Sequence, residues 1–257
     1  MPELVSREVT AADDAWIYVP DDAETTHTGD YLLVYYPTYW AGPTQVVQTH
    51  SERPAAELVA EVLAQVRDHG RSDVVWWVRD GLHPDGLEQH LVGAGARRDE
   101  TLTVLAKALD QPIPPAPGEP EVRAVADLAT LQDDHRVGVA AFEEQMPSEA
   151  ELQAELERLV GSNLTQTRLV AYLDGVPVGM GGARIADGAV RLWGGGTVPE
   201  YRRRGVYAAV LRARLNWALE QGARFALTRG RVETSAPILR REGFGVFGER
   251  RSYRLNA

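Results

Sequence analysis

The chain has 257 residues, of which 44% are hydrophobic and 25% are charged, and it contains no cysteine. The length suggests about two domains, and the composition is that of a globular chain rather than a disordered one. The absence of cysteine excludes disulfides, thiolate metal sites and thiol nucleophiles, and the net charge of −10 argues against general binding to nucleic acid or anionic membranes.

The charge is distributed unevenly along the chain. Residues 1–110 carry 8 basic and 19 acidic side chains, whereas residues 111–257 carry 19 basic and 18 acidic ones. An anionic ligand is therefore expected in the second half, and the acidic first half is suited to attract a cation. No apolar run is long enough to span a bilayer, and the polar N-terminal segment resembles neither a signal nor a transit peptide. We therefore expect a cytoplasmic protein with no nucleic-acid and no membrane partner.

A proline-rich segment divides the chain. Five of the ten residues from Gln111 to Pro120 are prolines, which favours an extended, semi-rigid linker. The expected domains are therefore residues 1–110 and 121–257, joined by residues 111–120. The alternative is a long surface loop within one domain.

In the first half, periodicity and turn residues predict the element order β-β-α-β-α-β. The predicted strands are Tyr31–Tyr36, Thr44–Thr49, Asp73–Val78 and Thr101–Leu109, and the helices run from Pro54 to about Gly70 and from Asp85 to Val92.

In the second half the predicted order is β-α-α-β-β-β-α-β-α-β, so its last six elements repeat the order of the first half. Asp127 and Ser148 are expected to cap the first two helices, and Asp174-Gly175 and Asp187-Gly188 to form two-residue hairpin turns. The remaining predicted elements are strand Glu121–Ala126, strand Ala189–Val198, a helix ending near Gln221, strand Arg224–Thr228, helix Thr234–Arg241 and strand Phe244–Leu255.

The most informative segment runs from Gly194 to Leu211 and places a glycine-containing turn between a strand and a helix. Free backbone N–H groups and the helix dipole at such a turn favour a pyrophosphate; Gly205 permits close approach, while Arg203 and Arg204 add charged donors. Neither a Gly-Lys-Ser/Thr phosphate loop nor a Gly-x-Gly-x-x-Gly fingerprint occurs here. The alternative is an arginine-rich but ordinary helix start that faces solvent.

The pattern Arg202-x-x-Gly205-x-Tyr207 after a strand, followed about thirty residues later by a helix that ends in Gly243-Phe244, resembles the GNAT superfamily of acyl-CoA N-acyltransferases. The resemblance covers about residues 121–254. It implies an α/β fold of two tandem GNAT-like domains, each a central, mostly antiparallel sheet flanked by helices. It also implies acetyl-CoA as cosubstrate, with the pantetheine held where a bulged strand splays, at Gly196, Thr197 and Val198, and the pyrophosphate held by Arg203, Arg204, Gly205, Val206 and Tyr207.

In the first half, the counterpart of this loop is Thr49–Pro54, which lacks the glycine, and its proline removes an amide donor. We therefore expect a degenerate domain that has lost the cofactor.

The usual catalytic residues of the family are missing. Its frequent acid, a tyrosine, corresponds to Leu239, and its frequent asparagine corresponds to Val232. Ser235, Thr234 and Tyr207 are the substitute acids, although a helix cap or turn is the more common role for a serine at the position of Ser235. The candidate bases are Glu143 and Glu144, which lie in a turn where the family builds its acceptor pocket, with Glu233 behind them; the alternative for each is a solvated side chain.

No histidine pair has metal-ligand spacing, and Asp133-Asp134-His135 is interpreted as a polar helix face, so no metal is expected. The sequence therefore predicts an acyl-CoA-dependent N-acetyltransferase that acts on the amine of a small molecule. The alternative is a non-catalytic acyl-CoA-binding sensor or scaffold. Both a monomer and a homodimer stay open.

Overall fold

The computed structural model describes residues 4–37, 42–161 and 165–257. The chain divides into two compact units. The larger unit consists of Met1–Ala12, Ala106–Arg229 and Arg240–Gly245, and the smaller unit of Asp13–Leu105, Gly230–Leu239 and Val246–Ala257. These units differ from the expected ranges 1–110 and 121–257, because the last strand of the chain belongs to the smaller unit.

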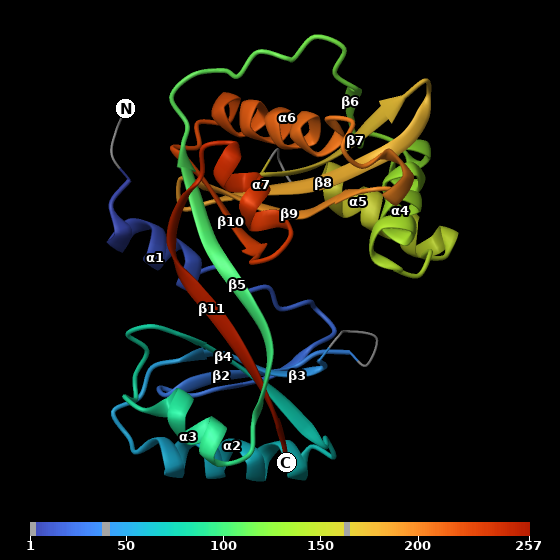
Figure 1. Ribbon diagram of the computed structural model, residues 1–257. Helices are drawn as coiled ribbons and strands as arrows, with labels where there is room; N and C mark the ends of the chain where they lie inside the picture. Colours follow the sequence, from blue (N-terminus) through green and yellow to red (C-terminus); the bar gives the residue numbers. More distant parts are fainter. Residues whose placement is uncertain (1–3, 38–41, 162–164) are drawn as a thin grey trace. The chain divides into compact units, whose positions relative to one another are not determined.

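The smaller unit is a mixed sheet with the strand order β1-β2-β3-β4-β11-β5. Its elements are β1 (Glu24–His27), β2 (Tyr31–Tyr35), β3 (Thr44–Thr49), α2 (Ala55–Asp68), β4 (Asp73–Arg79), α3 (Leu87–Gly93), most of β5 (Arg97–Ala108), most of α7 (Ser235–Arg241) and β11 (Gly245–Asn256). The predicted elements are present, and strand β1 was not predicted. Helices α2 and α3 cover one face of this sheet, which is visible in Figure 1.

The core of the smaller unit follows from the two periodicities of its elements. Alternate residues of β4, such as Val74 and Trp76, face α2, whose Leu58 and Val62 are fully buried. Strand β11 joins this core because it pairs antiparallel with the whole of β4, from Asp73 to Arg79, and buries Tyr253 and Leu255.

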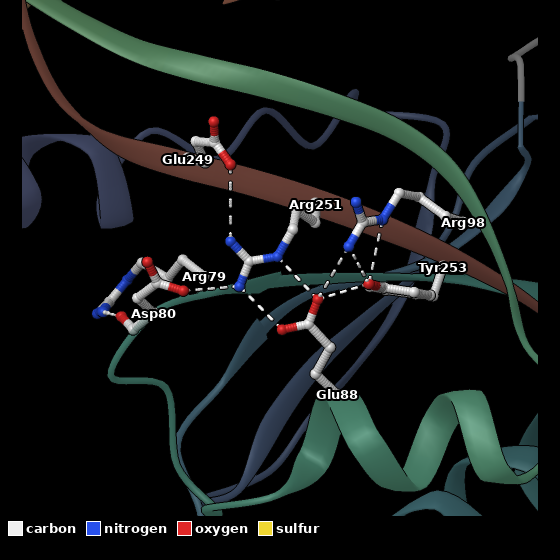
Figure 2. A network of polar contacts seen from close by, with 7 residues as sticks. All are labelled: Arg79, Asp80, Glu88, Arg98, Glu249, Arg251 and Tyr253. Carbon is white, nitrogen blue, oxygen red and sulfur yellow. Dashed lines mark hydrogen bonds and ion pairs between the residues drawn. The ribbon is translucent and has the colours of Figure 1, made fainter.

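A polar network also holds β11 in the smaller unit (Figure 2). Arg251 donates to the Glu88 carboxylate at 2.8 Å and to Asp80 at 2.7 Å. The Tyr253 hydroxyl donates to Glu88 and accepts from Arg98 at 2.8 Å. Arg251, through its hydrogen bonds, keeps the pKa of the Glu88 carboxyl below its usual value. The last strand is thus bound by side chains as well as by its backbone.

The larger unit has the strand order β10-β9-β8-β7-β6. Its elements are α1 (Ser6–Asp14, largely), β6 (Glu121–Ala124), α4 (Leu128–Phe142), α5 (Glu149–Val160), β7 (Gln166–Leu173), β8 (Val176–Ala186), β9 (Ala189–Thr197), a 3-10 turn (Pro199–Tyr201), α6 (Val206–Glu220) and most of β10 (Phe225–Arg231). All of these except α1 follow the predicted order.

Helices cover both faces of the larger unit's sheet (Figure 1). On β7, Val170 and Tyr172 face α4 and α5, whereas the residue between them, Ala171, faces α6. This alternation is the reason that β7 is buried over nearly its whole length, because both of its faces meet a helix. No helix within the described ranges is long and apolar enough to cross a membrane.

The local signals of the second half are confirmed. Asp127 and Ser148 each accept a backbone hydrogen bond and form complete capping boxes on α4 and α5. Asp174 and Asp187 have φ values of 50° and 53°, and each is followed by a glycine of positive φ. This is the geometry that a type I′ hairpin turn requires.

The proline-rich segment lies within the larger unit and is not a free spacer. The Ile113 N–H donates to the Asn216 side chain on α6, and that side chain donates back to the Ile113 carbonyl, both at 2.9 Å. Glu119 forms an ion pair with Arg212, also on α6. The segment is therefore docked on the outer face of this helix.

Candidate active site

The loop before α6 presents a helix N-terminus that no side chain caps. The N-cap residue Gly205 has a φ of 77°, and Arg203 has a φ of 62°. The first N–H groups of an α-helix have no acceptor within the helix, and left-handed residues before it help to gather backbone donors around one point. Arg203 and Arg204 are exposed beside these donors. The loop is therefore suited to bind a phosphate group.

Strand β9 extends beyond its pairing with β10. Parallel pairing joins Ala189–Leu192 to Phe225–Thr228, and β9 continues from Trp193 to Thr197. The Thr197 hydroxyl is buried and has no hydrogen-bond partner among the described residues. Because such a hydroxyl is costly to leave unpaired, this end of β9 is suited to meet a polar ligand.

A β-bulge distorts β9 at the same place. Trp193 and Gly196 pair with Gly182 and Met180 of β8, so β9 carries one residue more than β8 between these pairs. The extra residue bends the strand and disrupts the ladder locally. The bulged, splaying strand implied by the family resemblance is therefore present.

On the α4 side of the bulge lies a carboxylate. A Cβ on Gly196 would come within 2.7 Å of the Phe142 ring, so the end of α4 packs directly on the strand. Glu144 folds back onto the same helix: a Cβ on Gly138 would lie 2.3 Å from its Oε2 and 3.5 Å from the Met180 sulfur. Glycine at position 138 thus makes room for a carboxylate beside Met180, the partner of Gly196.

The other two predicted catalytic residues lie elsewhere. Glu143 is the C-cap of α4, with a φ of 60°, and like Glu144 it is exposed. Ser235 belongs to the smaller unit, where its hydroxyl accepts a hydrogen bond from the Arg231 N–H at 2.9 Å. This bond gives Ser235 the local turn role that was its alternative. Leu239, at the family's usual acid position, is buried.

A buried ionic cluster lies on the α4 side and was not predicted. Asp134, which has no exposed surface, is 2.8 Å from the Arg168 guanidinium. Arg168 also pairs with Glu155, which is 2.8 Å from His135, and its guanidinium lies over the Trp193 ring. Burial raises the pKa of Asp134 to about 6, which outweighs the opposite effect of Arg168.

The interpretation of Asp133-Asp134-His135 as a polar helix face was therefore wrong for Asp134. A signal was available in the sequence, because Asp134 falls on the same stripe of α4 as the buried residues Leu131 and Gly138. A charged residue within an apolar stripe indicates a buried partner. No group of three or more potential ligands that could hold a metal occurs within the described ranges.

On the α6 side of the bulge lies a tyrosine–arginine pair. A Cβ on Gly195 would be 3.2 Å from the Tyr207 ring and 3.1 Å from the Arg214 guanidinium. The fully buried Arg214 donates to the backbone carbonyls of Gly182 and Trp193, both at 3.3 Å, and hydrogen-bonds to Tyr207. Burial raises the pKa of Tyr207 and lowers that of Arg214.

Comparisons with known proteins agree with this geometry. Residues 127–237 match the model of the acetyltransferase (GNAT) family. A comparison with curated proteins found no match.

Solved structures share the fold over nearly the whole chain. A GCN5-related N-acetyltransferase from Kribbella flavida is 18% identical with a TM-score of 0.71, over 99% of this chain and 96% of that one. A GCN5-related N-acetyltransferase from Sphaerobacter thermophilus is 19% identical with a TM-score of 0.64, over 97% and 85%. A tandem GNAT protein from the clavulanic acid biosynthesis pathway is 16% identical with a TM-score of 0.63, over 93% and 85%. Residues 127–237 therefore form a domain that matches the GNAT acetyltransferase family, and the chain as a whole shares the mixed α/β fold of these solved structures.

Proposed function

We propose that this protein is an acyl-CoA-dependent N-acyltransferase that binds acetyl-CoA in its larger unit and transfers acetyl to the amine of a small molecule. The observation that carries the proposal is the juxtaposition of the α6 loop with the open, bulged end of β9. A CoA thioester combines an anionic pyrophosphate with a chain of amides. Its binding site therefore needs a group of anion-binding donors and, next to them, strand backbone groups that no neighbouring strand pairs.

The residues present fit this ligand. The unpartnered hydroxyl of Thr197 and the backbone of Gly196 and Val198 are suited to face the pantetheine amides. The backbone of residues 203–207, with the side chains of Arg203 and Arg204, would hold the pyrophosphate. A Cβ on Gly205 meets no protein atom within 4 Å, so the space in front of it is open for a ligand.

The start of α2, the corresponding place in the described part of the smaller unit, lacks these features. This helix begins after Pro54, which has no N–H to offer. Arg53, beside the helix start, is already engaged by Asp30 at 3.2 Å and Glu61 at 2.8 Å. We therefore propose that the smaller unit is a degenerate GNAT-like domain and that each chain binds one acetyl-CoA.

Acetyl-CoA supplies the activated acetyl group; the chain must orient the amine and accept its proton. Glu144 is the best candidate for the base, because its carboxylate lies beside Met180 and hence beside the bulge. Glu143 is the C-cap residue of α4, and Ser235 belongs to the other unit, where its hydroxyl accepts from the Arg231 N–H. An amine that reaches Glu144 would lose its proton on the α4 side of β9.

A non-catalytic acyl-CoA sensor is the second candidate. The observation in its favour is Leu239, a buried aliphatic side chain at the position where the resemblance places a tyrosine acid. Such a protein would bind acetyl-CoA without turnover.

The binding experiment compares Gly205→Ala with Gly222→Ala by calorimetric titration with acetyl-CoA. Both glycines flank α6 in left-handed conformations, with φ of 77° and 80°, and neither has a protein atom within 4 Å of an added Cβ. Alanine therefore costs each variant a similar backbone strain, about 1–2 kcal/mol. We expect one site per wild-type chain, affinity weakened about tenfold or more in Gly205→Ala, and unchanged affinity in Gly222→Ala.

Equal affinities for the two variants, or two sites per chain, would contradict the proposed cofactor site. Release of free thiol from acetyl-CoA in the presence of a panel of small amines then separates the two functions. Turnover on any amine supports the transferase, and binding without turnover on all of them supports the sensor.

A further inference from the structure

We propose that Tyr207 is the proton donor of this site and that the buried Arg214 positions its hydroxyl. The inference rests on the proposed function, since it assigns a role towards the sulfur of the bound thioester. It gives the larger unit an acid of its own, whereas the expected candidate Ser235 lies in the smaller unit.

The first observation is the position of Tyr207. It lies in the first turn of α6, directly after the loop that would hold the pyrophosphate, and its side chain is half-buried. Its ring lies against Gly195, within the bulge where β9 no longer pairs with β10. The phenol thus links the two parts of the proposed acetyl-CoA site.

The second observation is the unusual environment of Arg214. Its guanidinium is fully buried, and no carboxylate among the described residues forms an ion pair with it. Its partners are two backbone carbonyls and Tyr207, and its Nε has no partner in the described part of the chain. Glycine at positions 181 and 195 makes room for it, because a Cβ on either would lie within about 3 Å of the guanidinium.

A buried cation without a counter-charge is costly, so its retention calls for a compensating role. Beside a tyrosine, the cation stabilises the phenolate that remains after the phenol has given up its proton. It also holds the hydroxyl in one orientation. Arg214 is therefore a positioning residue, and Tyr207 is the group that would touch the reacting sulfur.

The bulge separates the two proton transfers. Gly194 and Gly196 face the α4 side, where Met180 and Glu144 lie, and Gly195 faces Tyr207 on the α6 side. As the C–N bond forms and the C–S bond breaks, one proton leaves the amine nitrogen for Glu144. A second proton passes from the Tyr207 oxygen to the sulfur, and the phenolate regains a proton from solvent after the thiol has left.

The test uses free CoA as the probe and needs no acceptor. The pKa of the protein-bound CoA thiol is measured from thiolate absorbance in wild type, Tyr207→Phe and Tyr172→Phe, with CoA affinity measured alongside. Tyr172 is a buried tyrosine of the same unit whose hydroxyl bonds to Asp133, outside the site. We expect the thiol pKa to be about one unit higher in Tyr207→Phe than in wild type, because a hydrogen bond to the thiolate is lost, and unchanged in Tyr172→Phe.

Arg214→Lys and Arg214→Met give the second arm. If Arg214 acts through its charge and hydrogen bond, lysine retains part of the effect and methionine raises the thiol pKa as Tyr207→Phe does. With an amine that the panel identifies, kcat should fall about 10–100-fold in Tyr207→Phe with the KM for acetyl-CoA unchanged.

The outcomes separate this inference from the proposed function. An unchanged thiol pKa in Tyr207→Phe, with CoA bound as in wild type, overturns the role of Tyr207 and leaves the acetyl-CoA site intact. Failure of wild type to bind CoA overturns both. If Arg214→Met does not fold, the Tyr207→Phe result decides alone.

Discussion

Buried charged residues set the chemistry of the larger unit. Asp134 forms an ion pair with Arg168 on the α4 side, while Arg214 relies on backbone carbonyls and a phenol on the α6 side. Charges in such places are expensive, and each is tolerated because a partner compensates for the lost water. They differ in kind from the exposed arginines at positions 202–204, which remain available to a ligand.

Asp134 predicts a particular pH dependence of stability. Its pKa is raised from 3.8 to about 6 in the folded protein, so between these values the folded state binds the proton more tightly than the unfolded state. The contribution of this carboxyl to stability is therefore full below about pH 4 and is lost as the pH rises through 6. In Asp134→Asn this loss is absent. Urea denaturation measures the free energy of unfolding of both proteins. Between pH 4 and pH 7, the value for Asp134→Asn should rise relative to that of wild type by on the order of 2 kcal/mol. A difference that does not vary with pH would contradict the assignment.

Glu143 and Glu144 form a natural matched pair, since they are adjacent, identical in type and differently placed. General base catalysis contributes about 10²–10⁴-fold, so Glu144→Gln should lower kcat by about 10²-fold at neutral pH. Glu143→Gln should stay within about twofold of wild type. The measurement is thiol release with an acceptor from the amine panel, and a larger loss in Glu143→Gln would reverse the assignment.

At the scale of elements, α6 has two roles on opposite sides. Its N-terminus and inner face carry Gly205, Tyr207 and Arg214, whereas its outer face carries Arg212 and Asn216, which hold the proline-rich segment. Packing of this segment stabilises the helix that positions the proposed cofactor loop. Prolines reduce the entropy that the segment loses on docking.

Asn216→Ala should therefore release residues 111–120 from α6. Two hydrogen bonds to Ile113 are lost, which should lower stability by about 1–2 kcal/mol and increase proteolytic cleavage in the segment. Asn216→Asp is the matched control, because it keeps the acceptor for the Ile113 N–H and should give an intermediate effect. Unchanged stability and cleavage in Asn216→Ala would show that the docking contributes little.

At the scale of the whole molecule, each compact unit is built from stretches that are far apart in the sequence. Strand β11 comes after all of the larger unit's strands in sequence but pairs with β4 in the smaller unit. The residues before the linker therefore do not form a complete unit by themselves. Their core includes Tyr253 and Leu255 from the end of the chain.

Leu255→Ala tests this composition. The side chain is 5% exposed within the smaller unit's core, so its truncation should cost about 2–5 kcal/mol. Hydrogen exchange should accelerate in α2 and β4, elements that lie almost two hundred residues earlier in the chain. Val246→Ala, on the same strand but 51% exposed, should leave exchange unchanged. Faster exchange confined to the larger unit would contradict the division.

The sequence by itself determined the features that depend on near neighbours. The capping boxes at Asp127 and Ser148, the hairpin turns at Asp174 and Asp187, and the glycine-started helix at Gly205 involve residues at most a few positions apart. Their geometry follows from side-chain chemistry and backbone sterics within the segment, so the pattern of residues suffices. Apart from α1 and β1, the element order followed from the same local signals, and so did the location of the proposed anion-binding loop.

The tertiary structure alone decided which distant residues meet. The burial of Asp134, the contact of Tyr207 and Arg214 with Gly195, and the approach of Glu144 to Met180 depend on strand register and helix packing between separate elements. Ser235 and β11 entered the smaller unit for the same reason, since strand pairing is non-local and a one-dimensional pattern does not specify the partner. The catalytic candidates could therefore be proposed from sequence, but the choice among them required the fold.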